Sequence, residues 1–115
     1  MNENKRIDKE LYALGISKKY KGYHLLKVAV MLALEDEFRL QAVIQEIYIP
    51  VAERFGCREY NVVKNIGTVS HIIWKYNREK LFEAANYEMT KEPSVSELIS
   101  ILVADIQRNE IKETA

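Results

Sequence analysis

The segment from Val51 to Trp74 limits the fold more than any other part of the chain, because it contains two amphipathic stretches separated by one short break. A stretch of helical period with a single apolar face predicts a helix that packs against a core. Gly56 falls where the chain has to turn between the two stretches. This order predicts a helix-turn-helix at about residues 51–75. The apolar faces consist of Val51, Ala52 and Phe55 in the first stretch and Val62, Ile66, Val69 and Ile73 in the second.

The two helices permit two interpretations. In a DNA-binding helix-turn-helix the second helix lies in the major groove and turns its polar side toward the base edges. An ordinary helical hairpin in a small bundle needs the same apolar spacing, since packing alone produces it. The apolar pattern therefore predicts the helices without deciding between these functions.

Length and composition indicate one intracellular domain. With 115 residues and 48% hydrophobic content the chain can form a single core, so we expect one domain over residues 1–115. No apolar run reaches the roughly 20 residues that cross a bilayer, and residues 1–10 are too polar for a signal peptide. The only cysteine, Cys57, has no disulfide partner and no zinc-ligand spacing around it. We expect a cytoplasmic protein without a metal site, a cofactor or membrane contact.

The formal charges sum to zero, whereas a DNA-binding domain usually has an excess of basic residues. Their distribution is uneven, with a net charge of +4 in residues 1–28, −3 in 29–37, +3 in 38–80 and −4 in 81–115. A basic segment that contains the predicted helix-turn-helix, beside an acidic C-terminal segment, could orient the domain on a duplex. Solvated faces of ordinary amphipathic helices produce the same distribution, so this interpretation also stays open.

Helical signals extend over most of the remaining chain, and no strand-period alternation interrupts them. A helix over residues 5–14 should end at Gly15, because glycine suits the left-handed conformation that follows a helix. Residues 22–35 are apolar on most sides, which is typical of a buried central helix. The fold class is therefore all-α, a compact bundle of about six helices.

The segments on either side of the predicted helix-turn-helix also indicate helices. The helix before it should end near Tyr48, because Pro50 interrupts it. Residues 78–85 predict a short helix, and Ser94 followed by Glu97 predicts a capping box at the start of the last one. The apolar positions of the helix before Tyr48 are Phe38, Leu40, Val43, Ile44 and Ile47.

The sequence resembles a known family at positions spread over nearly the whole chain. The matching residues are Lys21-Gly22-Tyr23 with Leu26 and Ala29, Tyr48 with Val51-Ala52 and Phe55, Val62 with Ile66 and Trp74, and Pro93 with Ser96-Glu97 and Val103-Ala104-Asp105. In this order they are similar to the C-terminal DNA-binding effector domain of stage-zero sporulation protein A, the sporulation master regulator of endospore-forming bacteria. The resemblance implies a six-helix domain whose helix-turn-helix is formed by residues 51–55 and 59–75.

The resemblance also implies a function and partners. It implies a transcription regulator that binds short boxes in double-stranded promoter DNA, often as a tandem homodimer, with RNA polymerase or a related regulator as a further partner. In the family a phosphorylatable receiver domain normally precedes this domain. Nothing before Leu11 could hold a receiver, so we expect either an excised domain or a stand-alone paralogue without one.

The positions through which the family reads bases are changed in this chain. An acidic residue followed by two arginines on the recognition helix corresponds to Val63, Lys64 and Gly67, of which only Lys64 is charged. Arginine binds guanine through a planar fork that lysine replaces only in part. We therefore expect weaker binding or a different DNA box. The candidate DNA-binding residues are Arg58, Tyr60, Asn61, Val63, Lys64, Asn65, Gly67, Thr68 and His71.

Two functions of different classes follow. The first is a sequence-specific DNA-binding regulator that reads promoter DNA with the helix at about 59–75. The second is a protein-interaction module that kept the fold, lost the DNA readout and modulates a full-length regulator; Val63, Gly67 and the zero net charge support it. We do not expect an enzyme, because Glu35 and Glu37 have no nucleophile, histidine or phosphate-binding loop beside them.

Overall fold

The computed structural model describes residues 2–114 and confirms the all-α fold class, because every regular element in that range is helical. None of these helices is both long and apolar enough to cross a membrane. The elements are α1 (Glu3–Ala13), α2 (Lys21–Glu35), the 3₁₀ helix η1 (Glu37–Ala42), the π-helix η2 (Ile44–Tyr48), α3 (Ile49–Phe55), α4 (Glu59–Tyr76), α5 (Arg78–Ala85) and α6 (Val95–Thr114).

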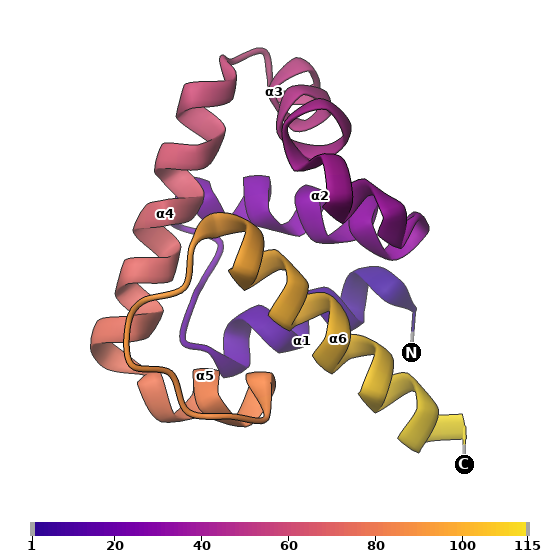
Figure 1. Ribbon diagram of the computed structural model, residues 1–115, viewed down its shortest axis with the longest axis vertical. Coiled ribbons are helices and arrows are strands. Elements are labelled where there is room, and N and C mark those ends of the chain that lie inside the picture. Colours follow the sequence, from indigo (N-terminus) through magenta and orange to yellow (C-terminus); the bar gives the residue numbers. More distant parts are fainter. Residues whose placement is uncertain (1, 115) are drawn as a thin grey trace.

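Helix α2 is the centre of the bundle, as its apolar composition predicts. It contacts α1, α3, α4 and α6, and buried residues occur on several of its sides. In Figure 1 α4 runs along one edge of the molecule, α3 lies at the top, and α6 crosses diagonally toward the C-terminus. One core cluster joins residues from all these helices. The element that carries the candidate recognition surface therefore rests on a buried helix and not on a loop.

The end of α1 lies where glycine predicts it. The backbone N–H of Gly15 donates to the carbonyl oxygen of Tyr12 at 2.9 Å, and Gly15 has a φ of +82°. Only glycine adopts this conformation without a steric penalty from a Cβ atom. At the other end, the Asn2 side chain accepts a hydrogen bond from the backbone N–H of Lys5 at 2.9 Å and caps the helix.

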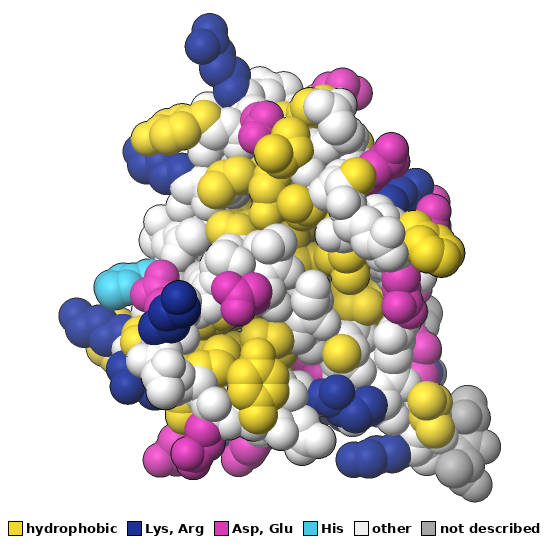
Figure 2. Space-filling view, in the orientation of Figure 1, with side chains coloured by type: hydrophobic (Ala, Val, Ile, Leu, Met, Phe, Trp, Pro, Cys, Tyr) yellow, Lys and Arg dark blue, Asp and Glu magenta, His cyan; other side chains and the backbone are white. Residues whose placement is uncertain are grey.

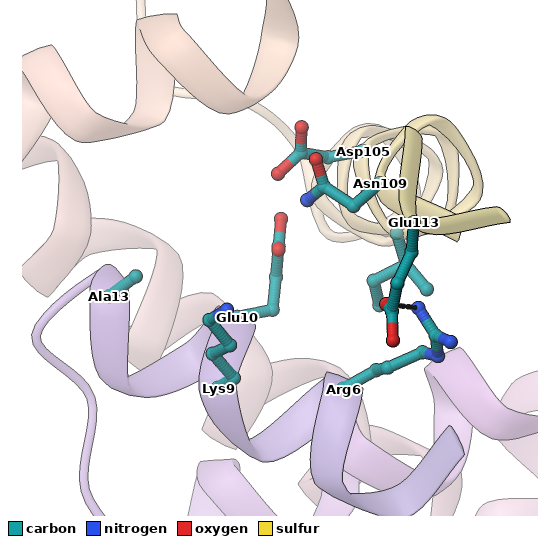
Figure 3. Close-up of a pocket in the computed structure, with 8 residues that line it drawn as sticks. Arg6, Lys9, Glu10, Ala13, Asp105, Asn109 and Glu113 are labelled. Atoms are coloured by element: carbon teal, nitrogen blue, oxygen red, sulfur yellow. Dashed lines mark hydrogen bonds and ion pairs between the residues drawn. The ribbon is translucent and has the colours of Figure 1, made fainter. Parts of the chain in front are cut away.

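The contact between α1 and α6 contains a buried carboxyl group, Glu10, which is 9% exposed. Its side chain extends from α1 toward Asp105 and Asn109 on α6 (Figure 3). Burial, together with the neighbouring carboxyl of Asp105, raises the pKa of Glu10 to about 9. At the outer end of the same interface Arg6 Nη1 lies 2.6 Å from Glu113 Oε2.

The segment between α2 and α3 differs from the single amphipathic helix that the sequence predicts. It is a 3₁₀ helix followed by a π-helix. The 3₁₀ helix has fewer residues per turn than an α-helix, and the π-helix has more. The predicted 3.6-residue apolar stripe is therefore not maintained. Phe38 is 76% exposed and Ile44 is 49% exposed, whereas Ile47 is fully buried.

The boundary at Tyr48 is confirmed, but Pro50 does not interrupt the helical path. Tyr48 and Ile49 both have right-handed helical backbone angles, so η2 continues directly into α3. Pro50 occupies the first turn of α3, where a backbone N–H would have no partner within that helix.

The C-terminal elements agree with the sequence prediction. Helix α5 covers Arg78–Ala85 and ends at Asn86, which has a φ of +68°. Before α6 the capping box is formed in both directions: the Ser94 backbone N–H donates to Glu97 Oε1 at 3.0 Å, and the Glu97 backbone N–H donates to Ser94 Oγ at 3.2 Å. Hydrogen bonds from the Ser94 backbone N–H and from the Ser94 side chain to the carboxylate lower the pKa of Glu97.

Candidate nucleic-acid interface

Helices α3 and α4 meet through a turn that requires glycine. Gly56 has a φ of +64°, and among the described residues beyond its chain neighbours no atom lies within 4 Å of the position that a Cβ would occupy. The requirement is therefore conformational, not a matter of space. The backbone N–H of Cys57 donates to the carbonyl oxygen of Ala52 at 3.0 Å and satisfies an end group of α3. Both predicted helices and their turn are thus present.

The apolar face of α3 is shorter than predicted. Val51 and Ala52 are buried, but Phe55 is 41% exposed. Phe55 is the last residue of α3, immediately before the left-handed turn, so its ring lies at the rim of the packed region. The prediction that Phe55 joins the core stripe is therefore wrong.

The apolar face of α4 agrees with the prediction at every position. Its four expected core residues are each no more than 1% exposed. Since successive residues on a helix are about 100° apart, the opposite side faces away from the bundle. We call the exposed residues there the outer stripe, which consists of Tyr60, Lys64, Thr68, His71 and Lys75.

The two flanks of α4 lie against other helices. On one flank Gly22, in the first turn of α2, contacts α4 at Asn65 and Val69. On the other flank the Cβ position of Gly67 is 4.0 Å from Val95 Cγ2, at the start of α6. Both flanks are half-buried as a result, and only the outer stripe is presented to a large partner.

Four of the nine candidate residues lie in these half-buried flanks. They are less available to a partner than the sequence suggested, because Val63 packs against the hydrophobic core and Gly67 faces α6. The four are Asn61, Val63, Asn65 and Gly67. The exposed candidates are Arg58, which precedes the first residue of α4, and Tyr60, Lys64, Thr68 and His71 on the outer stripe.

Several polar side chains of α4 already have hydrogen-bond partners. Asn65 Nδ2 donates to the carbonyl oxygen of Asn61 at 2.7 Å, and Thr68 Oγ1 donates to that of Lys64 at 3.1 Å. By contrast, Lys64 Nζ lies 5.9 Å from the centre of the Tyr60 ring, within the range of a cation–π interaction. Tyr60 and Lys64 therefore form a pair on the surface.

One contact of this surface was not predicted from the sequence. His71 Nδ1 lies 2.8 Å from Glu92 Oε1, which joins the outer stripe to the loop before α6. The two residues are 21 positions apart, and no local pattern links them. Lys75 continues the outer stripe by one more turn and is also a candidate that the sequence analysis omitted.

The charge around α4 is mixed and not uniformly basic. Figure 2 shows Lys and Arg side chains along the edge that α4 forms, with acidic side chains between them. Glu59 lies in the first turn of α4, where a negative charge is favoured by the helix dipole. Within residues 2–114, no group of three or more His, Cys, Asp or Glu is placed to hold a metal ion.

Comparison with known families identifies this arrangement. The model of the family described as "Sporulation initiation factor Spo0A C terminal" matches residues 7–106, which is most of the chain. The chain belongs to this family. The match confirms the resemblance seen in the sequence and includes all of α3 and α4. The chain is thus a DNA-binding effector domain of the Spo0A type, and this family is one of transcription regulators and not of enzymes.

Proposed function

We propose that this chain regulates transcription by binding promoter DNA sequence-specifically, with α4 in the major groove. The observation that supports this most is the division of α4 into two sides. Four fully buried apolar residues attach one side to the bundle, and the outer stripe presents tyrosine, lysine, threonine and histidine on the other. A helix attached in this way can enter a groove without disturbing the core.

The candidate residues have different roles in this proposal. Lys64 contacts a guanine edge or a phosphate, and Arg58, at the start of α4, contacts the backbone. Tyr60 adds to the surface toward the bases, and Thr68 and His71, which have hydrogen-bond partners in the free protein, lie beside it. The half-buried residues on the two flanks of α4 hold the helix in position against the bundle. They are Asn61, Val63, Asn65 and Gly67. The DNA box differs from that of the family, since no arginine fork is present at Lys64 or Gly67.

The charge distribution supports salt-sensitive binding of moderate strength. Each phosphate neutralised by Lys or Arg releases counterions, so affinity decreases as salt concentration rises. The net charge of zero indicates few such contacts. We propose that residues 1–115 form one domain and that two copies bind tandem boxes as a homodimer, which increases the affinity for DNA. RNA polymerase or a related regulator is then a partner at the promoter, and the protein acts in the cytoplasm.

Fluorescence anisotropy tests this proposal with a randomised duplex pool and the promoter box of the family, each at low and physiological salt. Lys64→Ala should weaken binding about tenfold, which is typical of one lost base contact. The control is Lys80→Ala, because Lys80 is an exposed lysine on α5, 3.9 Å from Glu83 Oε2. Absence of binding to every duplex at low salt would refute the proposal.

One observation favours a protein-interaction module as a second candidate. Phe38 and Ile44, in η1 and η2, expose large apolar side chains. Exposed apolar side chains that form a contiguous patch mark sites that bind another protein. We propose as the alternative that this chain pairs with the effector domain of a full-length regulator. The double variant Phe38→Ser, Ile44→Ser should then abolish co-elution with that regulator and leave DNA binding unchanged. Co-elution that is unaffected would exclude this surface.

A further inference from the structure

We infer that Tyr60 and Lys64 together select a thymine close to a guanine in the DNA that α4 contacts. Tyr60 acts through the thymine methyl group, and Lys64 acts through the guanine edge. This inference rests on the proposed function, since it requires α4 to lie in the major groove. Lys64 occupies the position of one arginine of the family pattern, whereas Tyr60 lies outside that pattern.

The first step is that few other side chains on α4 are available to read bases. Asn65 and Thr68 each donate a hydrogen bond to a backbone carbonyl four residues earlier. His71 is within hydrogen-bond distance of Glu92, and Gly67 has no side chain. A group that already has a partner must lose it before it contacts a base, which reduces its contribution to binding.

The second step is the position of Tyr60. It lies in the first turn of α4, and recognition helices of this type contact bases mainly through their N-terminal residues. Tyr60 is 70% exposed, so most of its surface stays in water in the free protein. Lys64, one turn later, is oriented with its Nζ 5.9 Å from the ring centre. The two side chains therefore project from the same side of the helix.

The third step is chemical complementarity. An aromatic ring makes a favourable apolar contact with the thymine C5-methyl group, which only thymine presents in the major groove. A lysine ammonium donates to guanine O6 and N7. Four residues of helix correspond to about 6 Å, and neighbouring base pairs are about 3.4 Å apart. The selected bases are therefore one or two steps from each other.

Replacement of single thymines by uracil tests the inference, because uracil lacks only the methyl group. The preferred duplex is first selected from a randomised pool with the wild-type protein, and each dT is then replaced by dU. One replacement should weaken wild-type binding about fourfold, the effect of losing one buried methyl group. Tyr60→Phe should keep this sensitivity to dU, and Tyr60→Ala should lose it.

Tyr76→Ala is the matched control. Tyr76 is a 69% exposed tyrosine at the other end of α4, and Lys75 Nζ lies 5.3 Å from its ring centre. This variant should retain both the selected sequence and the dU effect. If the wild-type protein binds the selected duplex and no dU replacement weakens it, the inference is wrong while the proposed function stands. If the wild-type protein binds no duplex, the proposed function fails first, and the inference with it.

Discussion

Gly22 and Asn65 hold α2 and α4 in direct backbone contact. A Cβ atom on Gly22 would be 3.0 Å from the carbonyl carbon of Asn65 and closer still to its oxygen, and 2.6 Å from Val69 Cγ2. The first turn of the central helix thus lies against the middle of the candidate recognition helix. The position of the outer stripe relative to the bundle depends on this absence of a side chain.

Gly22→Ala should therefore destabilise the protein strongly. The added methyl group meets main-chain atoms of α4, which cannot move without displacing the helix. We expect a loss of about 3 kcal/mol or more in the free energy of unfolding. Urea denaturation followed by circular dichroism measures this loss. A change of less than about 1 kcal/mol would show that α2 and α4 are not held this closely in solution.

Gly67→Ala makes the same chemical change on the other flank of α4 and should have the opposite effect. The nearest atom to a Cβ there is Val95 Cγ2 at 4.0 Å, so the methyl group fits. Alanine in a helix interior is more favourable than glycine by about 0.5–1 kcal/mol. We expect a gain of that size in the same denaturation experiment. A loss instead would indicate that the space between α4 and α6 is smaller than the structure shows.

Glu10→Gln should increase stability, and more so at high pH. The pKa of Glu10 is about 9 in the folded protein against 4.5 for the ordinary group, so the folded state holds an extra proton between these values. The contribution of this proton to the free energy of unfolding is fully present below about pH 4.5, and it is lost as the pH rises toward 9. Glutamine stays neutral, so its advantage should reach about 1–3 kcal/mol near pH 8 and be small near pH 5.

The control for this experiment is Glu88→Gln, because Glu88 is an exposed acid in the loop before α6. Thermal or urea unfolding at both pH values should give the same stability for Glu88→Gln and the wild-type protein. If the free energy of unfolding of Glu10→Gln has the same pH dependence as that of the wild-type protein, Glu10 is not the group that titrates.

Ser94→Ala should cost about 1 kcal/mol of stability, because it removes the side-chain acceptor for the Glu97 backbone N–H. Its effect should be smaller in a Glu97→Ala background, since the two side chains form one capping box. A double-mutant cycle measures this coupling. Ser100→Ala is the matched control, since Ser100 is an exposed serine within α6. Equal losses for both serines would contradict a specific capping role.

Most of the helices were predictable from the sequence, and the reason is local. Apolar residues at helical spacing, Gly15 and Gly56 at the turns, and the Ser94–Glu97 capping box all act within a few residues of chain. The connecting segment was not predictable in the same way. Its apolar residues fit an α-helical pattern, but η1 and η2 wind with other periods, so Phe38 and Ile44 are exposed.

The candidate site was predictable as a helix but not as a surface. The sequence identified α4 and its buried face, whereas the flanks depend on which neighbours reach α4 from distant parts of the chain. Gly22 and Val95 lie against the flanks of α4 and leave them half-buried. Asn65 and Gly67 are therefore less exposed to a partner than Lys64. No local pattern encodes those contacts.

Residue spacing was sufficient to establish the helical class and the boundaries of most helices, because these follow from local hydrogen bonding and from the burial of one side of each helix. The resemblance to the family rested on matching residues spread along the chain, and the family match confirms it. The packing of the whole chain selected which polar residues of α4 face outward. It also paired His71 with Glu92, which are 21 positions apart in the chain. These relationships join residues whose positions depend on helices crossing, and helix crossing is a property of the assembled core.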